Sequence, residues 1–217
     1  MLGTVGDVMT RDVVTAGADT PFKELVRLLG AHRISALPVV EGGRLLGVVS
    51  EADLALKVEL PPLAREPAPH LALWAGRRRT ATVKTAATQT GKLMTSPAVT
   101  VLVTATLAEA ARLLHSRQVK RAPVVDGDGR LVGIVTRSDL LRPYLAGDRQ
   151  LAAAVVSEVL DARLGLPWGS VRVEAEDGVV TLTGRVSRAP AARSLVDAVG
   201  RFDGVVGVVD RLRVGAG

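Results

Sequence analysis

Two spacings of hydrophobic positions follow one another in the first sixty residues and predict mixed α+β structure. A helix is predicted to begin at Pro21, because proline suits the first helical position and Asp19-Thr20 precede it. The apolar residues of this helix share one face at helical spacing: Phe22, Leu25, Val26 and Leu29. The pattern then changes to short runs of Val and Leu, which are typical of buried strands.

These runs predict a hairpin with a further helix after it. The strands are Leu37–Val40 and Leu45–Val49, and Glu41-Gly42-Gly43 between them has the composition of a tight turn. A short strand at Val13–Thr15 is predicted ahead of the first helix, and Ser50 is a suitable N-cap for the last one. The predicted order is β-α-β-β-α.

The whole pattern occurs twice, since Met9–Leu54 aligns with Met94–Leu140 after one inserted residue before Gly129. In the second copy we expect a strand at Val99–Val101, a turn at Asp126–Gly129 and a helix capped by Thr136. The apolar face of its first helix consists of Leu107, Ala110, Ala111 and Leu114. One unit alone exposes a sheet face, so we expect the two copies to pack about a pseudo-twofold axis.

A different unit follows at the C-terminus. A helix is predicted over Leu151–Leu164, with an apolar face formed by Leu151, Val155, Val159 and Ala162. A hairpin turning at Asp177-Gly178, a helix over 189–202 and a strand from Gly204 to Asp210 come next. This α-β-β-α-β order predicts a sheet covered on one face by two helices, with Gly184 and Gly204 at element ends.

Composition narrows the possible functions. The chain has no cysteine, which excludes disulfides and thiolate metal sites, and its three histidines show no metal-ligand spacing. No signal peptide or long apolar run is present, so we expect a cytoplasmic location. A net charge of +6 favours anionic partners without choosing among them. No nucleophile–base pair occurs, so an enzyme is the least favoured class, and the Arg, Ala and Val content suggests a bacterial genome rich in GC.

A hydroxyl–carboxylate motif closes each repeat. Ser50 and Asp53, and likewise Thr136 and Asp139, follow a Gly-led strand in the pattern Gly-h-h-Ser/Thr-x-x-Asp, where h is hydrophobic. A helix N-terminus suits a phosphate, and a carboxylate there accepts hydrogen bonds from a ribose diol. Plain helix capping uses the same residues. Both interpretations stay open from the motif alone.

The segments His32–Val40 and Gly47–Leu54, with the twin Gly133–Leu140, are similar to CBS domains, and the paired copies resemble a Bateman module. The resemblance implies two clefts that bind adenosyl nucleotides such as AMP, ADP, ATP or S-adenosylmethionine, a regulatory role, and a homodimer. No cofactor beyond the regulatory ligand is implied.

The resemblance also implies which residues form each cleft, with the carboxylate of one repeat facing the strand segments of the other. The first cleft would contain Ser50, Asp53, Val99, Val119, Lys120, Arg121 and Ala122. The second would contain Thr136, Asp139, Val14, Ile34, Ser35 and Ala36. Four basic residues are candidates for phosphate contact: His32, Arg33, Lys120 and Arg121. The greater positive charge of the first cleft favours ATP there, and the second would prefer a less charged ligand such as AMP.

The C-terminal phrase Val-x-Val-x-x-x-Asp-Gly-Val-Val-Thr-Leu-Thr-Gly resembles a BON domain, a family associated with phospholipid surfaces. Arg172, Arg185, Arg188 and Arg193 are the candidates for membrane contact, although an ordinary solvated face is the favoured explanation for them. We therefore expect CBS repeats at 1–60 and 91–146, a basic insert at 61–90 and a BON domain at 147–217.

Three functions follow from the sequence. The leading one is a nucleotide sensor that relays its state to the BON domain or to an unknown protein partner. The second is a phospholipid-associated adaptor in which the repeats only dimerise. The third is a nucleic-acid binder that uses Trp74 and Arg77–Arg79 of the insert, and it is the weakest because three arginines and one tryptophan are a common combination.

Overall fold

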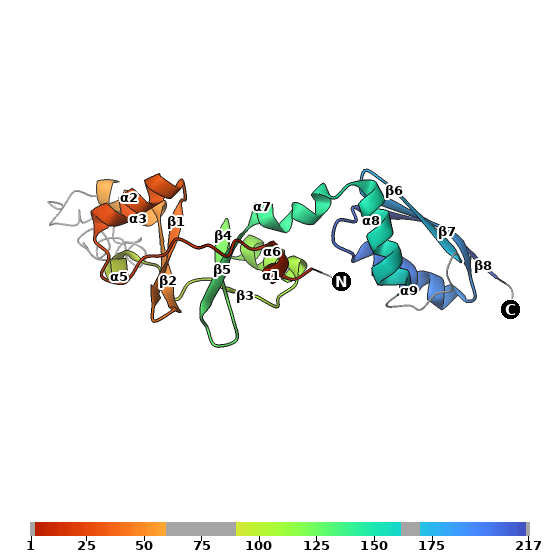
Figure 1. The fold of residues 1–217 in the computed structure, drawn as a ribbon, viewed down its shortest axis with the longest axis horizontal. Helices are drawn as coiled ribbons and strands as arrows, with labels where there is room; N and C mark the ends of the chain where they lie inside the picture. The colour runs from red at the N-terminus through yellow and green to blue at the C-terminus, as the bar shows by residue number, and fades with distance from the viewer. Residues whose placement is uncertain (1–2, 60–89, 162–169, 216–217) are drawn as a thin grey trace, which may run out of the picture. The chain divides into compact units, whose positions relative to one another are not determined.

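The computed structural model describes residues 3–59, 90–161 and 170–215 (Figure 1). The insert with Trp74 and Arg77–Arg79 lies outside the described residues. The chain divides into two compact units. One contains Met1–Met9, Thr104–Lys120 and Val135–Gly217, and the other contains Thr10–Val103 and Arg121–Ile134. The boundary between the units therefore passes through the second repeat.

The first repeat forms the predicted helix–hairpin–helix. Its elements are α2 (Phe22–His32), β1 (Ala36–Glu41), β2 (Arg44–Ser50) and α3 (Glu51–Glu59). β1 and β2 pair antiparallel, with Ala36 opposite Ser50. Gly42 and Gly43 both have positive φ, 55° and 81°, which the tight turn requires and which only glycine adopts without cost.

The second repeat has the same order. Its elements are β3 (Val101–Leu102), α6 (Leu107–Ser116), β4 (Arg121–Val125), β5 (Leu131–Thr136) and α7 (Arg137–Leu140). The sheet order is β3-β4-β5, with β3 parallel to β4. In the turn between β4 and β5 the Asp126 carboxylate accepts hydrogen bonds from the backbone of Asp128 and Arg130, which explains the acidic turn sequence.

Some predicted details are wrong. The first strand of repeat one is reduced to a single bridge between Ala16 and Val39, and its counterpart starts at Val101 instead of Val99. On the helices, Val26 is 48% exposed and Ala111 is also exposed. Only a narrow stripe of each helix is buried, because each covers a small sheet.

Each repeat begins with a short helix that packs on the other repeat. α1 (Val5–Val8) precedes repeat one, yet its first amide donates to the carbonyl of Ala105, 2.8 Å away, in the second repeat. α5 (Thr90–Leu93) precedes repeat two, yet the Thr90 amide and hydroxyl donate to the carbonyl of Thr20 in the first repeat. These are equivalent contacts in the repeat alignment.

The residues that follow α1 and α5 also bond to the other repeat. We call the stretches Val5–Thr10 and Thr90–Thr95 the leading segments. The backbones of Thr10 and Ile134 exchange two hydrogen bonds of 2.9 Å, and those of Thr95 and Val48 exchange two of 2.8 and 3.1 Å. Thr10 aligns with Thr95, and Val48 aligns with Ile134. This reciprocity is the pseudo-twofold relation that the sequence repeat predicts.

The C-terminal domain has the predicted α-β-β-α-β order. Its elements are α8 (Asp148–Val155), which continues as a π-helix (Val156–Asp161), then β6 (Val171–Glu176), β7 (Val179–Val186), α9 (Ala189–Gly200) and β8 (Gly207–Val214). β7 is central, antiparallel to β6 and parallel to β8. Both helices cover one face of the sheet, and a core containing Val155, Leu182 and Leu195 fills the space between the layers (Figure 1).

Hydrogen bonds and close approaches fix this domain's turns. The Asp148 carboxylate at the start of α8 accepts from the amides of Asp177 and Gly178 in the β6–β7 turn. Gly184 was predicted to lie at the end of an element, but it lies inside β7. A Cβ atom there would lie 2.2 Å from the Ser170 carbonyl oxygen, so the close approach of the backbone requires glycine. The last strand starts three residues later than predicted, at Gly207. The Ala162 position of the first helix lies outside the described residues.

A glycine in β2 provides a test of the exchanged segments. A Cβ atom on Gly47 would lie 2.7 Å from the Thr95 carbonyl oxygen and 2.9 Å from the Met94 sulfur. We expect Gly47→Ala to lower the free energy of unfolding by about 1–3 kcal/mol in urea denaturation, the usual cost of overpacking. The matched control is Gly30→Ala in α2, where a Cβ meets nothing within 4 Å. That change should be neutral or stabilising, by up to ~1 kcal/mol. Equal effects of the two changes would contradict this packing.

Candidate functional site

The motif in the first repeat forms a hydrogen-bonded box at the start of α3. The Ser50 amide and hydroxyl donate to Oδ2 of Asp53, at 3.0 and 2.7 Å, and the Asp53 amide donates back to the Ser50 hydroxyl at 3.3 Å. The predicted N-cap is therefore confirmed. The box also fixes the rotamer of the carboxylate, because one of its oxygens is held from two directions.

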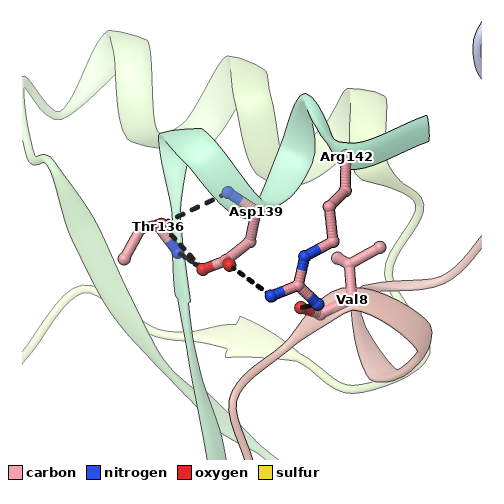
Figure 2. A network of polar contacts seen from close by, with 4 residues as sticks. All are labelled: Val8, Thr136, Asp139 and Arg142. Carbon is pink, nitrogen blue, oxygen red and sulfur yellow. Dashed lines mark hydrogen bonds and ion pairs between the residues drawn. The ribbon is translucent and has the colours of Figure 1, made fainter. Parts of the chain in front are cut away.

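The second repeat repeats this geometry at the start of α7. The Thr136 amide and hydroxyl donate to Oδ2 of Asp139, at 2.9 and 2.7 Å, and the Asp139 amide donates to the Thr136 hydroxyl at 3.3 Å (Figure 2). The Asp139 side chain is only 13% exposed. In both repeats Oδ2 belongs to the helix cap, so Oδ1 is the candidate oxygen for contact with a ligand.

The two Oδ1 atoms have different neighbours. The Thr95 hydroxyl lies 3.5 Å from Oδ1 of Asp53, at the limit of a hydrogen bond. At Asp139 the neighbour is a cation, since Nη2 of Arg142 lies 3.5 Å from Oδ1. Nη1 of Arg142 donates to the carbonyl oxygen of Val8 at 3.3 Å, and Figure 2 shows the guanidinium between these two oxygens.

The sequence analysis selected neither Thr95 nor Arg142. Thr95 had a signal, because the pair Met94-Thr95 repeats Met9-Thr10. Arg142 had none from the repeat, since the residue that aligns with it in the first repeat is Leu56.

Each box also contacts the strand segment of its own repeat. The Glu51 amide donates to the carbonyl of Ser35 at 3.0 Å, and the Arg137 amide donates to the carbonyl of Lys120 at 3.2 Å. Ala36 pairs with Ser50 in the β1–β2 ladder. The structure thus places Ser35 and Ala36 beside the Ser50 box. The crosswise assignment of strand segments to carboxylates stays a prediction.

The other predicted site residues divide by exposure. Ala36 and Ala122 are buried, and Val14 and Ile34 pack partly against the first core, so these positions offer backbone groups and not side chains. Val99, Val119 and Arg121 are partly exposed. Lys120, His32 and Arg33 are exposed. Arg33 also has a structural role, because it ends α2 in the left-handed conformation with φ of 52°.

Comparison with known families agrees with this architecture. The sequence matches the CBS domain at residues 5–59 and 91–145, and the BON domain at residues 147–216. The chain belongs to the CBS-domain family and carries a C-terminal BON domain. Within the described residues no group of three His, Asp or Glu side chains could hold a metal ion.

Relatives and solved structures match the CBS pair. A CBS domain-containing protein of Dictyostelium discoideum is 32% identical, over 63% of this chain and 88% of that protein. Chloroplastic CBSX1 of Arabidopsis thaliana is 33% identical, over 67% of each chain. The crystal structure of CBSX2 in complex with AMP is 33% identical with a TM-score of 0.50, and covers 65% of this chain and 96% of that one. These relatives are named as CBS-domain proteins and not as enzymes.

The arginines predicted for membrane contact separate onto two sides of the BON domain. Val171, Val180 and Leu182 belong to the core under the helices, so the exposed residues that alternate with them lie on the open face of the sheet. Four arginines meet at one end of that face: Arg172, Arg185, Arg211 and Arg213.

The remaining two predicted arginines lie elsewhere, since Arg188 is the N-cap of α9 and Arg193 is an exposed residue within it. Arg172 pairs with Glu174 at 3.0 Å. In the part of the chain that the structure describes, no helix is long and apolar enough to span a membrane.

The box at Thr136 predicts a measurable capping energy. We expect Thr136→Ala to lower the free energy of unfolding by about 0.5–2 kcal/mol, because the Asp139 amide loses its acceptor. Thr136→Ser keeps the hydroxyl and should change stability little. Urea denaturation of the two variants measures the difference, and equal losses would show that the methyl group, and not the cap, stabilises this site.

Proposed function

We propose that the chain is a regulatory protein that binds adenosyl nucleotides between its two CBS repeats, using Asp53 and Asp139 as the ribose-binding carboxylates. The observation that carries the proposal is the shared geometry of the two boxes. In each, Oδ2 accepts the hydrogen bonds of the cap, and Oδ1 has a donor 3.5 Å away, the Thr95 hydroxyl at Asp53 and the Arg142 guanidinium at Asp139. A ribose diol offers two hydroxyl donors, which such a pre-oriented acceptor suits.

The relatives support the choice of ligand class. CBSX2, which is 33% identical to this chain, has been crystallised with AMP. The strand segments around 34–36 and 119–122 have small or buried side chains at Ala36 and Ala122, and we propose that their backbone groups bind the adenine edge. Membership in the CBS family is consistent with a regulatory role, and no enzyme activity is proposed.

The proposal extends to how the signal leaves the site. Nucleotide binding would favour one arrangement of the CBS pair and pass this preference to the BON domain or to a protein partner. Such a switch requires different affinities for two states. A cytoplasmic homodimer, the assembly predicted from the sequence, is part of the same proposal.

Isothermal titration calorimetry with AMP, ATP and S-adenosylmethionine tests the carboxylates. We expect Asp53→Asn and Asp139→Asn each to weaken the binding of a nucleotide by about tenfold or more. This is the usual effect of removing a hydrogen bond to a charged group. Asparagine retains an oxygen for the cap, so the fold should survive, and the melting temperature serves as the control. If no nucleotide binds the unmodified chain, the boxes are helix caps only.

The open face of the BON sheet supports a second candidate, an adaptor that binds an anionic lipid surface. The specific observation is the convergence of Arg185, Arg211 and Arg213 on neighbouring strands of one face. Basic residues near an anionic membrane surface contribute about 1 kcal/mol each. This candidate does not need the boxes.

Flotation with vesicles of phosphatidylcholine, with and without phosphatidylserine, tests the adaptor. We expect the chain to float only with the anionic vesicles and at low salt. The double change Arg211→Glu and Arg213→Glu should abolish flotation, whereas Arg188→Glu and Arg193→Glu on the helical side should have little effect. Equal loss in both double variants would mean that net charge, and not this face, governs binding.

A further inference from the structure

The box in the second repeat has a cation beside Oδ1 of its aspartate. Oδ1 of Asp53 has a neutral neighbour, the Thr95 hydroxyl, whereas Oδ1 of Asp139 has the guanidinium of Arg142. The first repeat has Leu56 at the position aligned with Arg142, so the sequence does not supply the same cation there. The cation beside Asp139 therefore comes from a position at which the two repeats differ in sequence.

Arg142 is placed so that a ligand can engage it. Its side chain is 58% exposed, and its contacts to Asp139 and Val8 are long, at 3.5 and 3.3 Å. A guanidinium has five N–H donors in a planar fork that matches phosphate oxygens. These two contacts leave donors available, and exposed ion pairs of this kind are weak, so a phosphate can recruit Arg142 at little cost.

The chemistry of an adenosyl ligand connects the two residues. If the ribose diol binds Oδ1 of Asp139, the 5′ substituent of the same sugar comes near the guanidinium. In AMP this substituent is a phosphate dianion, in adenosine it is a neutral hydroxyl, and in S-adenosylmethionine it is a sulfonium cation. Opposite charges attract and like charges repel at this range, so the three ligands should respond differently to Arg142.

We propose that Arg142 is the specificity-determining residue of the Asp139 site, selecting a nucleoside 5′-phosphate over a neutral or cationic adenosyl ligand. The inference rests on the proposed function.

The experiment is calorimetry on the chain carrying Asp53→Asn, which leaves the Asp139 site as the main one. Arg142→Gln in this background should raise the dissociation constant of AMP by about tenfold or more, as expected for the loss of a charge-assisted hydrogen bond. The dissociation constant of adenosine should change by less than about twofold, and S-adenosylmethionine should bind more tightly. Arg142→Lys keeps the charge and should preserve the preference for AMP. Arg137→Gln, which changes an exposed arginine in α7, is the matched control.

The outcomes separate the two proposals. If all three ligands weaken equally, or none changes, Arg142 acts only through the fold and the inference is wrong while the site itself stands. If no ligand binds even before Arg142 is changed, the proposed function fails. Should Arg142→Gln unfold the protein, salt provides the second measurement. In the chain with Arg142 intact, rising salt must weaken AMP but not adenosine, and equal salt dependence would overturn the inference.

Discussion

The backbone hydrogen bonds between each leading segment and the hairpin of the other repeat are the constraint on which the rest of the CBS pair depends. Each repeat alone is a two- or three-stranded sheet with helices, too small to bury both of its faces. The hydrogen bonds of Thr10 with Ile134, and of Thr95 with Val48, attach a segment of one repeat to the hairpin strand of the other. Because these bonds join backbones, they fix the alignment of the repeats whatever side chains line the space between them.

This exchange also determines what stands beside the carboxylates. Thr95 is brought to Asp53 by the segment that pairs with Val48, and Val8 lies within reach of Arg142 because α1 packs on the second repeat. The leading segments therefore complete the environment of the boxes. If the proposed ligand binds there, a carboxylate that caps its own helix with one oxygen would link helix stability to ligand binding at a single residue.

The sequence predicted most of the fold because its signals were local. The glycines of the first turn, the proline before α2 and the hydroxyls of the two caps each specify their own backbone geometry. The contacts that it missed are between distant residues. The donation from the Thr90 hydroxyl to the Thr20 carbonyl joins residues far apart in the chain, and no periodicity encodes it. Val26 was assigned to the core because a helical face is wider than the stripe a small sheet can bury, and Gly184 was placed at a strand end because the approach of Ser170 is invisible in one dimension.

The candidate site divides in the same way, into local features that the sequence predicted and features that it did not. The boxes at Ser50 and Thr136 lie within four consecutive residues and were predictable as helix caps. Arg142 was not, because it breaks the internal symmetry that made the repeats recognisable. Residues at which two copies differ are where one copy can acquire a property of its own, so the departures from the repeat deserve the same scrutiny as the matches.

The exchanged helices have a consequence for the ancestry of the fold. A single ancestral repeat could have made the same contacts only in a swapped dimer, in which the first helix of each molecule packs on the other molecule. When two gene copies are joined end to end, these contacts between molecules become contacts within one chain, and none of them changes. The symmetry of such an ancestral dimer would then be retained within one chain.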